Sequence, residues 1–263
     1  MFEGDTLLAG KRAVITAGGN GIGAAMAKAL SAAGARVAVC DLDDSNFDAM
    51  LAAGDAVYAA KTDVSDFAQV SEFFEGAVAS LGGLDILVNN AGIAGPTGAL
   101  QDLDPDAWDK TVQVDLSSAF YCSKLAIPHI QAAGAGSIVN IASSAAFYGY
   151  PLRSPYAAAK WGLIGLTKTM AMELGPDQIR VNAICPGSVN GDRIRRVIEG
   201  EASSRGIGIE EVKKGYTKQV SLKTFVEKDD IANMVLFLCS KLGARISGQS
   251  LGVDGHTETL SQY

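Results

Sequence analysis

The chain has 263 residues, of which 48% are hydrophobic and 19% are charged, and its formal net charge is −7. This composition excludes an intrinsically disordered chain and suffices for one large domain. The excess of acidic side chains argues against a nucleic-acid partner, because binding to phosphates needs a surface rich in Lys and Arg. We therefore expect a small-molecule substrate and no nucleic acid.

Residues 1–5 carry acidic side chains where a secretory signal needs basic ones, and no segment approaches the roughly 18 apolar residues of a membrane span. The four cysteines lie far apart in apolar runs with no C-x-x-C pair, which is typical of buried thiols in a reducing compartment: Cys40, Cys122, Cys185 and Cys239. We expect a cytoplasmic protein that contacts no membrane.

Short β-branched runs alternate with longer amphipathic stretches along the chain, as in β-α-β units of a parallel sheet. Strands are predicted over 12–16, 36–40, 56–60, 85–89, 137–141, 180–184 and 250–253. Helices are predicted near 21–33, 66–81, 106–133, 155–174 and 228–240. The pattern indicates an α/β fold, a doubly wound (Rossmann) seven-stranded parallel sheet with helices on both faces, as a single domain over 1–263.

Two segments depart from regular alternation. The helix from residue 106 contains Pro128, so we expect it to bend or end there. Residues 187–225 are rich in charge and contain no predicted strand, which is typical of a substrate loop or lid. We expect short helices and mobility in this segment.

A cluster of glycines follows the first strand and opens the first helix. Backbone N–H groups at such a turn, together with the positive end of the helix dipole, can bind a pyrophosphate that a Cβ would exclude. The competing interpretation is a tight turn with close helix–strand packing. The residues predicted to bind the phosphates are Gly19, Asn20, Gly21, Ile22 and Gly23.

Asp41 lies at the end of the second strand, about 20 residues after the glycines, where a carboxylate can accept hydrogen bonds from both ribose hydroxyls. A carboxylate there also repels a 2′-phosphate, and no Lys or Arg occupies the turn. These features predict NAD rather than NADP as the cofactor. The alternative is that Asp41 is only a turn residue in the acidic run 41–44.

Tyr156 and Lys160 are four residues apart in a predicted helix, so the phenol and the ammonium share one face. A phenol is a poor base at neutral pH, and a nearby cation favours the phenolate. The pair can therefore serve general acid–base catalysis. Because the Y-x-x-x-K spacing is common in helices, the pair alone also fits two surface residues.

The joint order of these motifs is more specific. Asn89-Asn90-Ala91-Gly92 follows the fourth strand, Ser143 precedes Tyr156 by thirteen residues, and Pro186-Gly187 follows the sixth strand. Together with the glycine turn and Lys160, this arrangement resembles the short-chain dehydrogenase/reductase family over nearly the whole chain.

The resemblance implies a role for each matching residue. Tyr156 would exchange a proton with the substrate, Lys160 would assist it and hold the nicotinamide ribose, and Ser143 would bind the reacting oxygen, with Ser144 as the rival serine. Further contacts with the dinucleotide would come from Asp63, Val64, Asn90, Ala91, Gly92, Pro186, Gly187 and Val189. The resemblance also implies a homotetramer.

Three positions depart from the family pattern. The turn begins Thr16-Ala17 where the family has Thr-Gly. Asp115 occupies the position of the fourth catalytic residue, usually Asn, whose backbone carbonyl is thought to bind a relay water. Gly191 replaces the Thr that holds the nicotinamide carboxamide, for which Ser188 or the backbone of Val189 can substitute.

The predicted function is NAD-dependent hydride transfer between nicotinamide and a secondary alcohol or ketone, such as a polyol, sugar or hydroxy acid. A 3-oxoacyl reductase of the same fold and a non-catalytic dinucleotide-binding protein remain alternatives. No metal is implied, because neither histidine has a partner at metal-ligand spacing.

Arg153 lies near the predicted mouth of the site and could bind an acidic substrate, as could the arginines at 193, 195 and 196. The favoured alternative is that these arginines are solvated or paired with Asp192, Glu199 and Glu201.

Overall fold

The computed structural model describes residues 7–257, apart from the side chains of Arg193 and Ser204, so the expectation for residues 1–5 lies outside the described part. Seven parallel strands form one sheet in the order β3-β2-β1-β4-β5-β6-β7. This order confirms the predicted doubly wound fold. The strands are β1 (Arg12–Thr16), β2 (Arg36–Asp41), β3 (Tyr58–Lys61), β4 (Ile86–Asn89), β5 (Gly136–Ile141), β6 (Ile179–Pro186) and β7 (Ser250–Val253).

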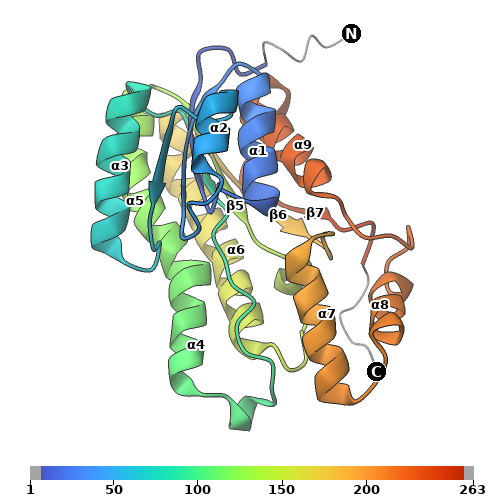
Figure 1. Cartoon of the computed structure of the whole chain (residues 1–263). Coiled ribbons are helices and arrows are strands. Elements are labelled where there is room, and N and C mark those ends of the chain that lie inside the picture. The colour runs from blue at the N-terminus through green and yellow to red at the C-terminus, as the bar shows by residue number, and fades with distance from the viewer. Residues whose placement is uncertain (1–6, 258–263) are drawn as a thin grey trace.

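Helices cover both faces of the sheet (Figure 1). One hydrophobic core joins the sheet to α1, α2 and α9, and a second joins its other face to α3, α5 and α6. The helices in the described part are α1 (Gly21–Ala32), α2 (Phe47–Ala53), α3 (Phe67–Leu81), α4 (Pro105–Val112), α5 (Ser118–Ala132), α6 (Ser154–Leu174), α7 (Asp192–Arg205), α8 (Ile209–Lys218) and α9 (Lys228–Cys239).

The central strands are covered on both faces, which explains their continuous apolar sequences. In β1, for example, Ala13, Val14 and Ile15 are all fully buried. After β3 the chain crosses to the other half of the sheet, so the strand order reverses between the neighbouring strands β1 and β4. At such a switch point the loops diverge to opposite faces and leave a crevice at the carboxyl ends of the strands.

The predicted helix over 106–133 is two helices. α4 and α5 are joined by one π-helical turn, Gln113–Ser117. Of the two outcomes expected at Pro128, an end is wrong, because α5 continues to Ala132, and a bend stays a prediction. Proline removes the hydrogen bond to the carbonyl of residue 124, and Lys124 and Pro128 are both exposed, so water can bind that carbonyl.

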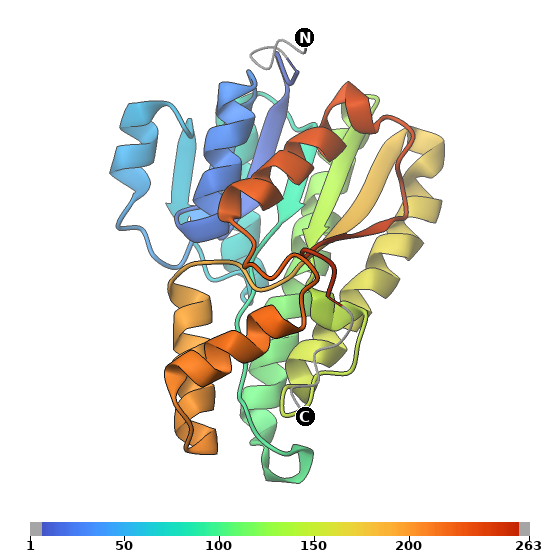
Figure 2. The same ribbon diagram turned by 90° about the vertical axis from the view of Figure 1, so that its right-hand side faces the viewer.

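The segment 187–225 forms the expected short helices, α7 and α8, which pack on each other through a small core of their own: Ile198, Ala202, Val212 and Tyr216. The base of the segment is closed by a bridge between Val189 and Val226 that the sequence pattern did not reveal. Figure 2 shows α7 and α8 beyond the sheet, at the end to which the strand arrows point. The segment is therefore placed beside the crevice.

Among the described residues, no helix is both long and apolar enough to cross a membrane. All four cysteines are unpaired and buried. Burial raises the pKa of Cys122, Cys185 and Cys239 to about 12, so their thiols stay protonated at neutral pH.

Asp85 joins the amino ends of the central strands. Its carboxylate accepts hydrogen bonds from the Arg12 backbone N–H (3.0 Å) and Nε (2.7 Å) and pairs with Lys11 (3.4 Å). Its backbone carbonyl accepts a bond from Ser137 at the start of β5. Burial alone would raise the pKa of Asp85, but the bonds and charges of Arg12 and Lys11 outweigh it and hold the pKa below its usual range.

Replacing Asp85 with Asn should lower the free energy of unfolding at pH 7 by about 1–3 kcal/mol, because it leaves Arg12 without its charge partner. A lowered folded-state pKa stabilises the fold above the ordinary Asp pKa of about 3.9, and this stabilisation is lost as pH falls through the folded-state value. Urea unfolding should therefore show a difference between wild type and variant that shrinks below about pH 4.

The control is Asp44→Asn, which removes an exposed pair with Lys61. It should change stability by less than about 0.5 kcal/mol. Equal effects of the two substitutions, or a difference that does not vary with pH, would contradict the role of Asp85.

Candidate active site

The glycine turn after β1 is packed too tightly for side chains at two of its positions. A Cβ on Gly23 would lie 1.9 Å from the Ala17 carbonyl oxygen, and one on Gly18 would lie 2.7 Å from Val39. These contacts are with backbone or with a buried branched side chain, so neither position accepts Ala without movement. The turn thus needs glycine for packing, and the same absence of side chains lets a ligand approach the backbone.

The amino end of α1 is directed at this turn. The helix begins at Gly21, and the N-cap residue Asn20 makes no capping hydrogen bond with its side chain, which instead binds Asp43 (3.2 Å). The first N–H groups of a helix lack partners within the helix, and they favour anions. This end of α1 is thus suited to bind phosphate oxygens.

Asp41 lies beside the turn, at the end of β2. Its Oδ2 accepts a hydrogen bond from the Gly19 N–H (3.0 Å), and Asn46 binds the carbonyl of the same glycine (2.9 Å). The half-buried carboxylate of Asp41 keeps further capacity to accept hydrogen bonds. The structure therefore brings Asp41, which is predicted to bind the ribose, next to the glycine turn, which is predicted to bind the phosphates.

Asn90 ties β4 to the same turn. Its side-chain amide donates to the carbonyls of Thr16 (3.0 Å) and Ala17 (2.9 Å), and the backbone N–H groups of Asn90 and Ala91 donate to the Thr16 hydroxyl. The turn and the segment that leads to Gly92 are thus one rigid unit. Thr16 is a contributor whose function the sequence did not reveal.

Lys160 is the buried centre of a second group of predicted site residues, the Lys160 cluster, which also contains Tyr156 and Asp115. Its side chain is 3% exposed; Nζ donates to the Ile141 carbonyl (3.2 Å) and lies 5.7 Å from the centre of the Tyr156 ring. A Cβ on Gly92 would lie 3.1 Å from the same nitrogen. Tyr156 and Lys160 are therefore not a solvated surface pair; they lie where β4, β5 and α6 meet.

Asp115 supplies a counter-charge in this cluster. Its carboxylate is fully buried, lies 3.8 Å from Lys160 Nζ, and accepts a hydrogen bond from the Ile93 N–H (2.6 Å) through Oδ1. The π-helical turn between α4 and α5 holds it there. The family resemblance implies a role for the backbone carbonyl of Asp115, whereas the structure shows an ion pair made by its side chain.

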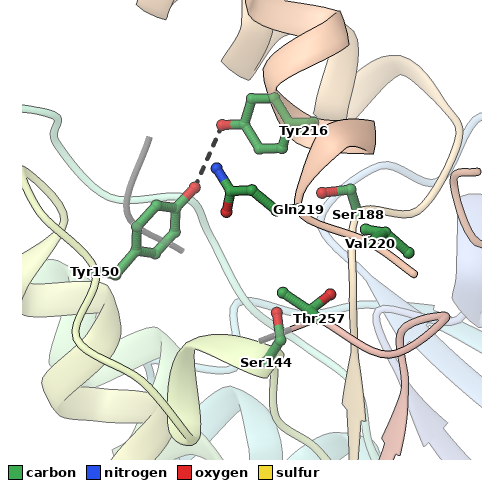
Figure 3. A pocket seen from close by; sticks show the side chains of 7 residues that line it. All are labelled: Ser144, Tyr150, Ser188, Tyr216, Gln219, Val220 and Thr257. Carbon is green, nitrogen blue, oxygen red and sulfur yellow. Dashed lines mark hydrogen bonds between the residues drawn. The ribbon is translucent and has the colours of Figure 1, made fainter. Parts of the chain in front are cut away.

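The two candidate serines have different surroundings. Ser143 is half-buried after β5, and its hydroxyl accepts a hydrogen bond from the Ala145 N–H (3.1 Å). Ser144 is buried and lines a small cavity of about 20 Å³ between the loop that precedes α6 and helix α8 (Figure 3). That cavity has room for about one water molecule. The choice of Ser143 over Ser144 as the substrate-binding serine stays a prediction.

Figure 3 also shows how α8 is attached to this region: the phenols of Tyr150 and Tyr216 meet at 3.3 Å. Tyr216 donates in turn to Glu201 on α7 (3.1 Å). Burial raises the pKa of both tyrosines, so both phenols stay protonated. This chain of hydrogen bonds joins α7 and α8 to the loop before α6.

A larger cavity of about 390 Å³ lies between α7 and the segment after β4. It is lined by Gly92, Ile93, Ala94, Gly95, Thr97, Arg153, Arg196, Val197 and Gly200. Because Gly92 adjoins Lys160, one end of the cavity lies against the cluster of Lys160, Tyr156 and Asp115. Its size is in the usual range for small-molecule sites. Apart from Arg153, Arg196 and Gly92, its lining residues carry no signal in the sequence that marks them as site residues.

The favoured prediction for the arginines is right for only part of the set. Arg195 pairs with Asp192 (2.8 Å) on the exposed side of α7, and Arg196 is exposed as well, so both agree with the favoured prediction. Arg153 is 6% exposed and forms no ion pair with a described residue, so its interpretation as a solvated or acid-paired side chain is wrong. The Arg193 side chain lies outside the described part.

Other predicted residues lie around the crevice without contacting the Lys160 cluster in any described interaction. Asp63 binds Ser65 and pairs with Lys110 of α4 (3.3 Å). Although burial opposes it, these contacts hold the pKa of Asp63 below its usual range. Val64 is buried in the core. The expected cofactor contacts of Pro186, Gly187 and Val189 stay predictions.

Comparisons with known proteins agree with this geometry. A family model described as enoyl-(acyl carrier protein) reductase matches residues 16–256. The chain is 37% identical to trans-4-hydroxycyclohexanecarboxylate dehydrogenase of Sinomonas cyclohexanicum, covering 94% of this chain and 93% of that protein. It is 34% identical to D-beta-hydroxybutyrate dehydrogenase of Cupriavidus necator, covering 95% and 98%.

A solved structure of carveol dehydrogenase from Mycobacterium avium in complex with NAD superposes with a TM-score of 0.87 at 28% identity, covering 95% of this chain and 98% of that one. The chain belongs to the short-chain dehydrogenase/reductase family. The family and the fold predicted from the sequence are thus confirmed, and the predicted oxidoreductase class agrees with the named relatives.

The backbone conformation of Ala17 predicts strain in the glycine turn, and this strain can be tested by substitution. Its φ of +48° is in the left-handed region, where a side chain costs about 1 kcal/mol. Ala17→Gly should therefore raise the free energy of unfolding by about 0.5–1 kcal/mol, measured as a higher midpoint in urea. Ala52→Gly, on the exposed side of α2, should lower stability by about 1 kcal/mol. A loss of stability in both variants would contradict the strain at Ala17.

Proposed function

We propose that this protein is an NAD-dependent oxidoreductase that interconverts a secondary alcohol and a ketone. The observation that carries the proposal is the buried ammonium of Lys160 beside the Tyr156 ring, at one end of a cavity of about 390 Å³. A lysine with 3% exposure is rare unless its charge is paired, and here the Asp115 carboxylate at 3.8 Å pairs it and holds it beside the phenol. Its Nζ lies 5.7 Å from the centre of the ring whose phenol would transfer the proton.

Tyr156 is the general acid and base in this proposal. The phenolate removes the hydroxyl proton of an alcohol as hydride leaves the carbinol carbon, and the phenol returns a proton to the ketone in the reverse direction. The Ser143 hydroxyl binds the reacting oxygen and stabilises the charge that develops on it. Asp115 keeps Lys160 in place through their ion pair, and Lys160 orients the phenol.

The residues at the glycine turn fit a dinucleotide. Positions 18 and 23 have no room for a Cβ, the amino end of α1 favours phosphate, and Asp41 adjoins Gly19. Asp41 would hold the adenosine ribose, Asn90 keeps the turn in shape, and Lys160 would hold the second ribose. NAD, when bound, supplies the acceptor for hydride. The NAD in the carveol dehydrogenase complex supports this assignment.

The named relatives support an alcohol as substrate. Hydroxycyclohexanecarboxylate and beta-hydroxybutyrate each carry a secondary hydroxyl group, and both relatives are dehydrogenases. They favour alcohol oxidation over the alternative of 3-oxoacyl reduction. The complete set of Ser143, Tyr156 and Lys160 argues against a protein that binds the dinucleotide without turnover.

The proposal extends to assembly and location. Large apolar side chains are exposed on two neighbouring helices: Phe120 on α5 (51% exposed), and Trp161 (51%) and Met172 (82%) on α6. Burial of these faces against further copies would give the homotetramer, and sedimentation of the protein as a monomer would contradict it. Four unpaired cysteines fit a reducing compartment such as the cytoplasm.

The direct test of the function is to compare turnover by wild type with turnover by a variant that lacks the Tyr156 hydroxyl. A panel of secondary alcohols, sugars and hydroxy acids should reduce NAD, measured as absorbance of NADH, and Tyr156→Phe should lower kcat by about 10²- to 10⁴-fold while NADH binding is retained. Tyr58→Phe, on the edge strand β3, is the control and should keep full activity. Unchanged turnover in Tyr156→Phe, or no turnover of any alcohol by wild type, would overturn the proposed function.

Asp41 generates a second test. Asp41→Asn removes the charge that repels a 2′-phosphate, so the preference for NAD over NADP, as a ratio of kcat/KM values, should fall by about 10- to 100-fold. Most of the change should be a gain with NADP. Asp48→Asn, an exposed acid on α2, should leave the ratio unchanged. A ratio unaffected by Asp41→Asn would remove the ribose role of this carboxylate.

A further inference from the structure

Arg153 is a cation buried beside the proposed reaction centre. Only 6% of the residue is exposed, and its guanidinium carbon lies 5.4 Å from the centre of the Tyr156 ring and 5.3 Å from that of Tyr150. The two rings cover the guanidinium through cation–π contacts, which are much weaker than pairing with an anion. The charge is thus held in a low-dielectric position within reach of the substrate.

The hydrogen bonds of Arg153 are incomplete. Nη2 donates to the Ala94 carbonyl (2.6 Å), whereas Nε is buried and makes no hydrogen bond to any residue in the described part. A guanidinium has five N–H donors, and a buried donor without an acceptor costs about 1–3 kcal/mol. No carboxylate among residues 7–257 lies within ion-pair distance of Arg153. The protein supplies a cation here without its counter-ion.

A second arginine lines the same cavity from the opposite wall. Arg196 belongs to α7, and within the described part it forms no ion pair, whereas its neighbour Arg195 is paired with Asp192. The loop that carries Arg153 is fixed to the remaining wall, because the Gly98 N–H donates to the Leu152 carbonyl (3.0 Å). The buried Arg153 and the exposed Arg196, which belong to separate elements, therefore both line one cavity, and no acidic residue of the described part lines it.

We propose that Arg153 and Arg196 form an anion subsite and that the substrate is a small hydroxy acid, with a secondary hydroxyl at Tyr156 and a carboxylate or comparable oxyanion at the two arginines. This inference rests on the proposed function. A guanidinium binds a carboxylate through two parallel N–H groups, which fixes orientation as well as affinity. Because Arg153 lies against Tyr156 itself, the anionic group and the hydroxyl are only a few bonds apart.

The test compares a hydroxy acid with its neutral methyl ester on the same carbon skeleton. We expect wild type to prefer the acid, and Arg153→Met, which keeps an apolar stem between the tyrosines, to lower kcat/KM for the acid by about 10- to 100-fold with little change for the ester. Arg196→Gln should act in the same direction, and Arg153→Lys should restore part of the loss. Arg195→Gln is the matched control and should change neither substrate.

Binding of butyrate and butyramide to the enzyme–NADH complex, measured by calorimetry, gives a readout that does not need turnover. Butyrate should bind wild type at least about tenfold more tightly than butyramide, and Arg153→Met should remove the difference while its melting temperature and NADH affinity stay close to wild type. Equal binding of the two probes by wild type, or equal loss for acid and ester in Arg153→Met, would overturn the subsite.

The two proposals fail in different ways. Absence of turnover with every alcohol, together with selective butyrate binding that depends on Arg153, would contradict the oxidoreductase and retain the anion subsite. Rapid turnover of neutral alcohols with no preference for acids would retain the oxidoreductase and contradict the anion subsite.

Discussion

The burial of the Lys160 ammonium is the constraint around which the active site is built. A charge taken out of water needs compensation from every side, and the compensation comes from three separate elements: the Ile141 carbonyl at the end of β5, the Asp115 carboxylate in the π-helical turn, and the Tyr156 ring one turn earlier in α6. Gly92 has no side chain, so the backbone after β4 can approach the same nitrogen. The contacts of this one ammonium group therefore join β4, β5 and α6 with the π-helical turn that precedes α5.

The fold could be predicted because its signals are local. A strand buried on both faces has to be continuously apolar, as in β1, and a helix between two strands has to bury one side, so the alternation alone indicates a doubly wound sheet. The predictions that fell short depend on contacts from elsewhere in the chain. The short helix α2 is fixed by the packing of Phe47 and Met50 on the core, and the π-helical turn holds Asp115 opposite Lys160. Neither contact leaves a local period in the sequence.

The same distinction divides the site. The spacing of Tyr156 and Lys160 within one helix and the glycines at the start of another are local patterns, so the sequence indicated them. The pairing of Asp115 with Lys160 joins residues 45 positions apart, and the cavity joins the loop of Arg153 to α7. The sequence indicates that Arg153 lies near the mouth of the site but favours a solvated or acid-paired side chain, since most arginines are exposed or paired. Only the packing of Tyr150 and Tyr156 around it shows that its charge is buried.

The two buried cations next to Tyr156 differ in one respect that separates their functions. Lys160 has a carboxylate at 3.8 Å, so its charge is largely balanced within the protein and it can remain in place whether or not a ligand is bound. Arg153 has only aromatic faces and a carbonyl, so its charge is balanced only when an anion enters. An anion that binds there is desolvated on one side by the same rings and held against the reacting phenol. In the proposed mechanism, the balanced charge of Lys160 would keep the phenol in position, and the unbalanced charge of Arg153 would favour an anionic substrate.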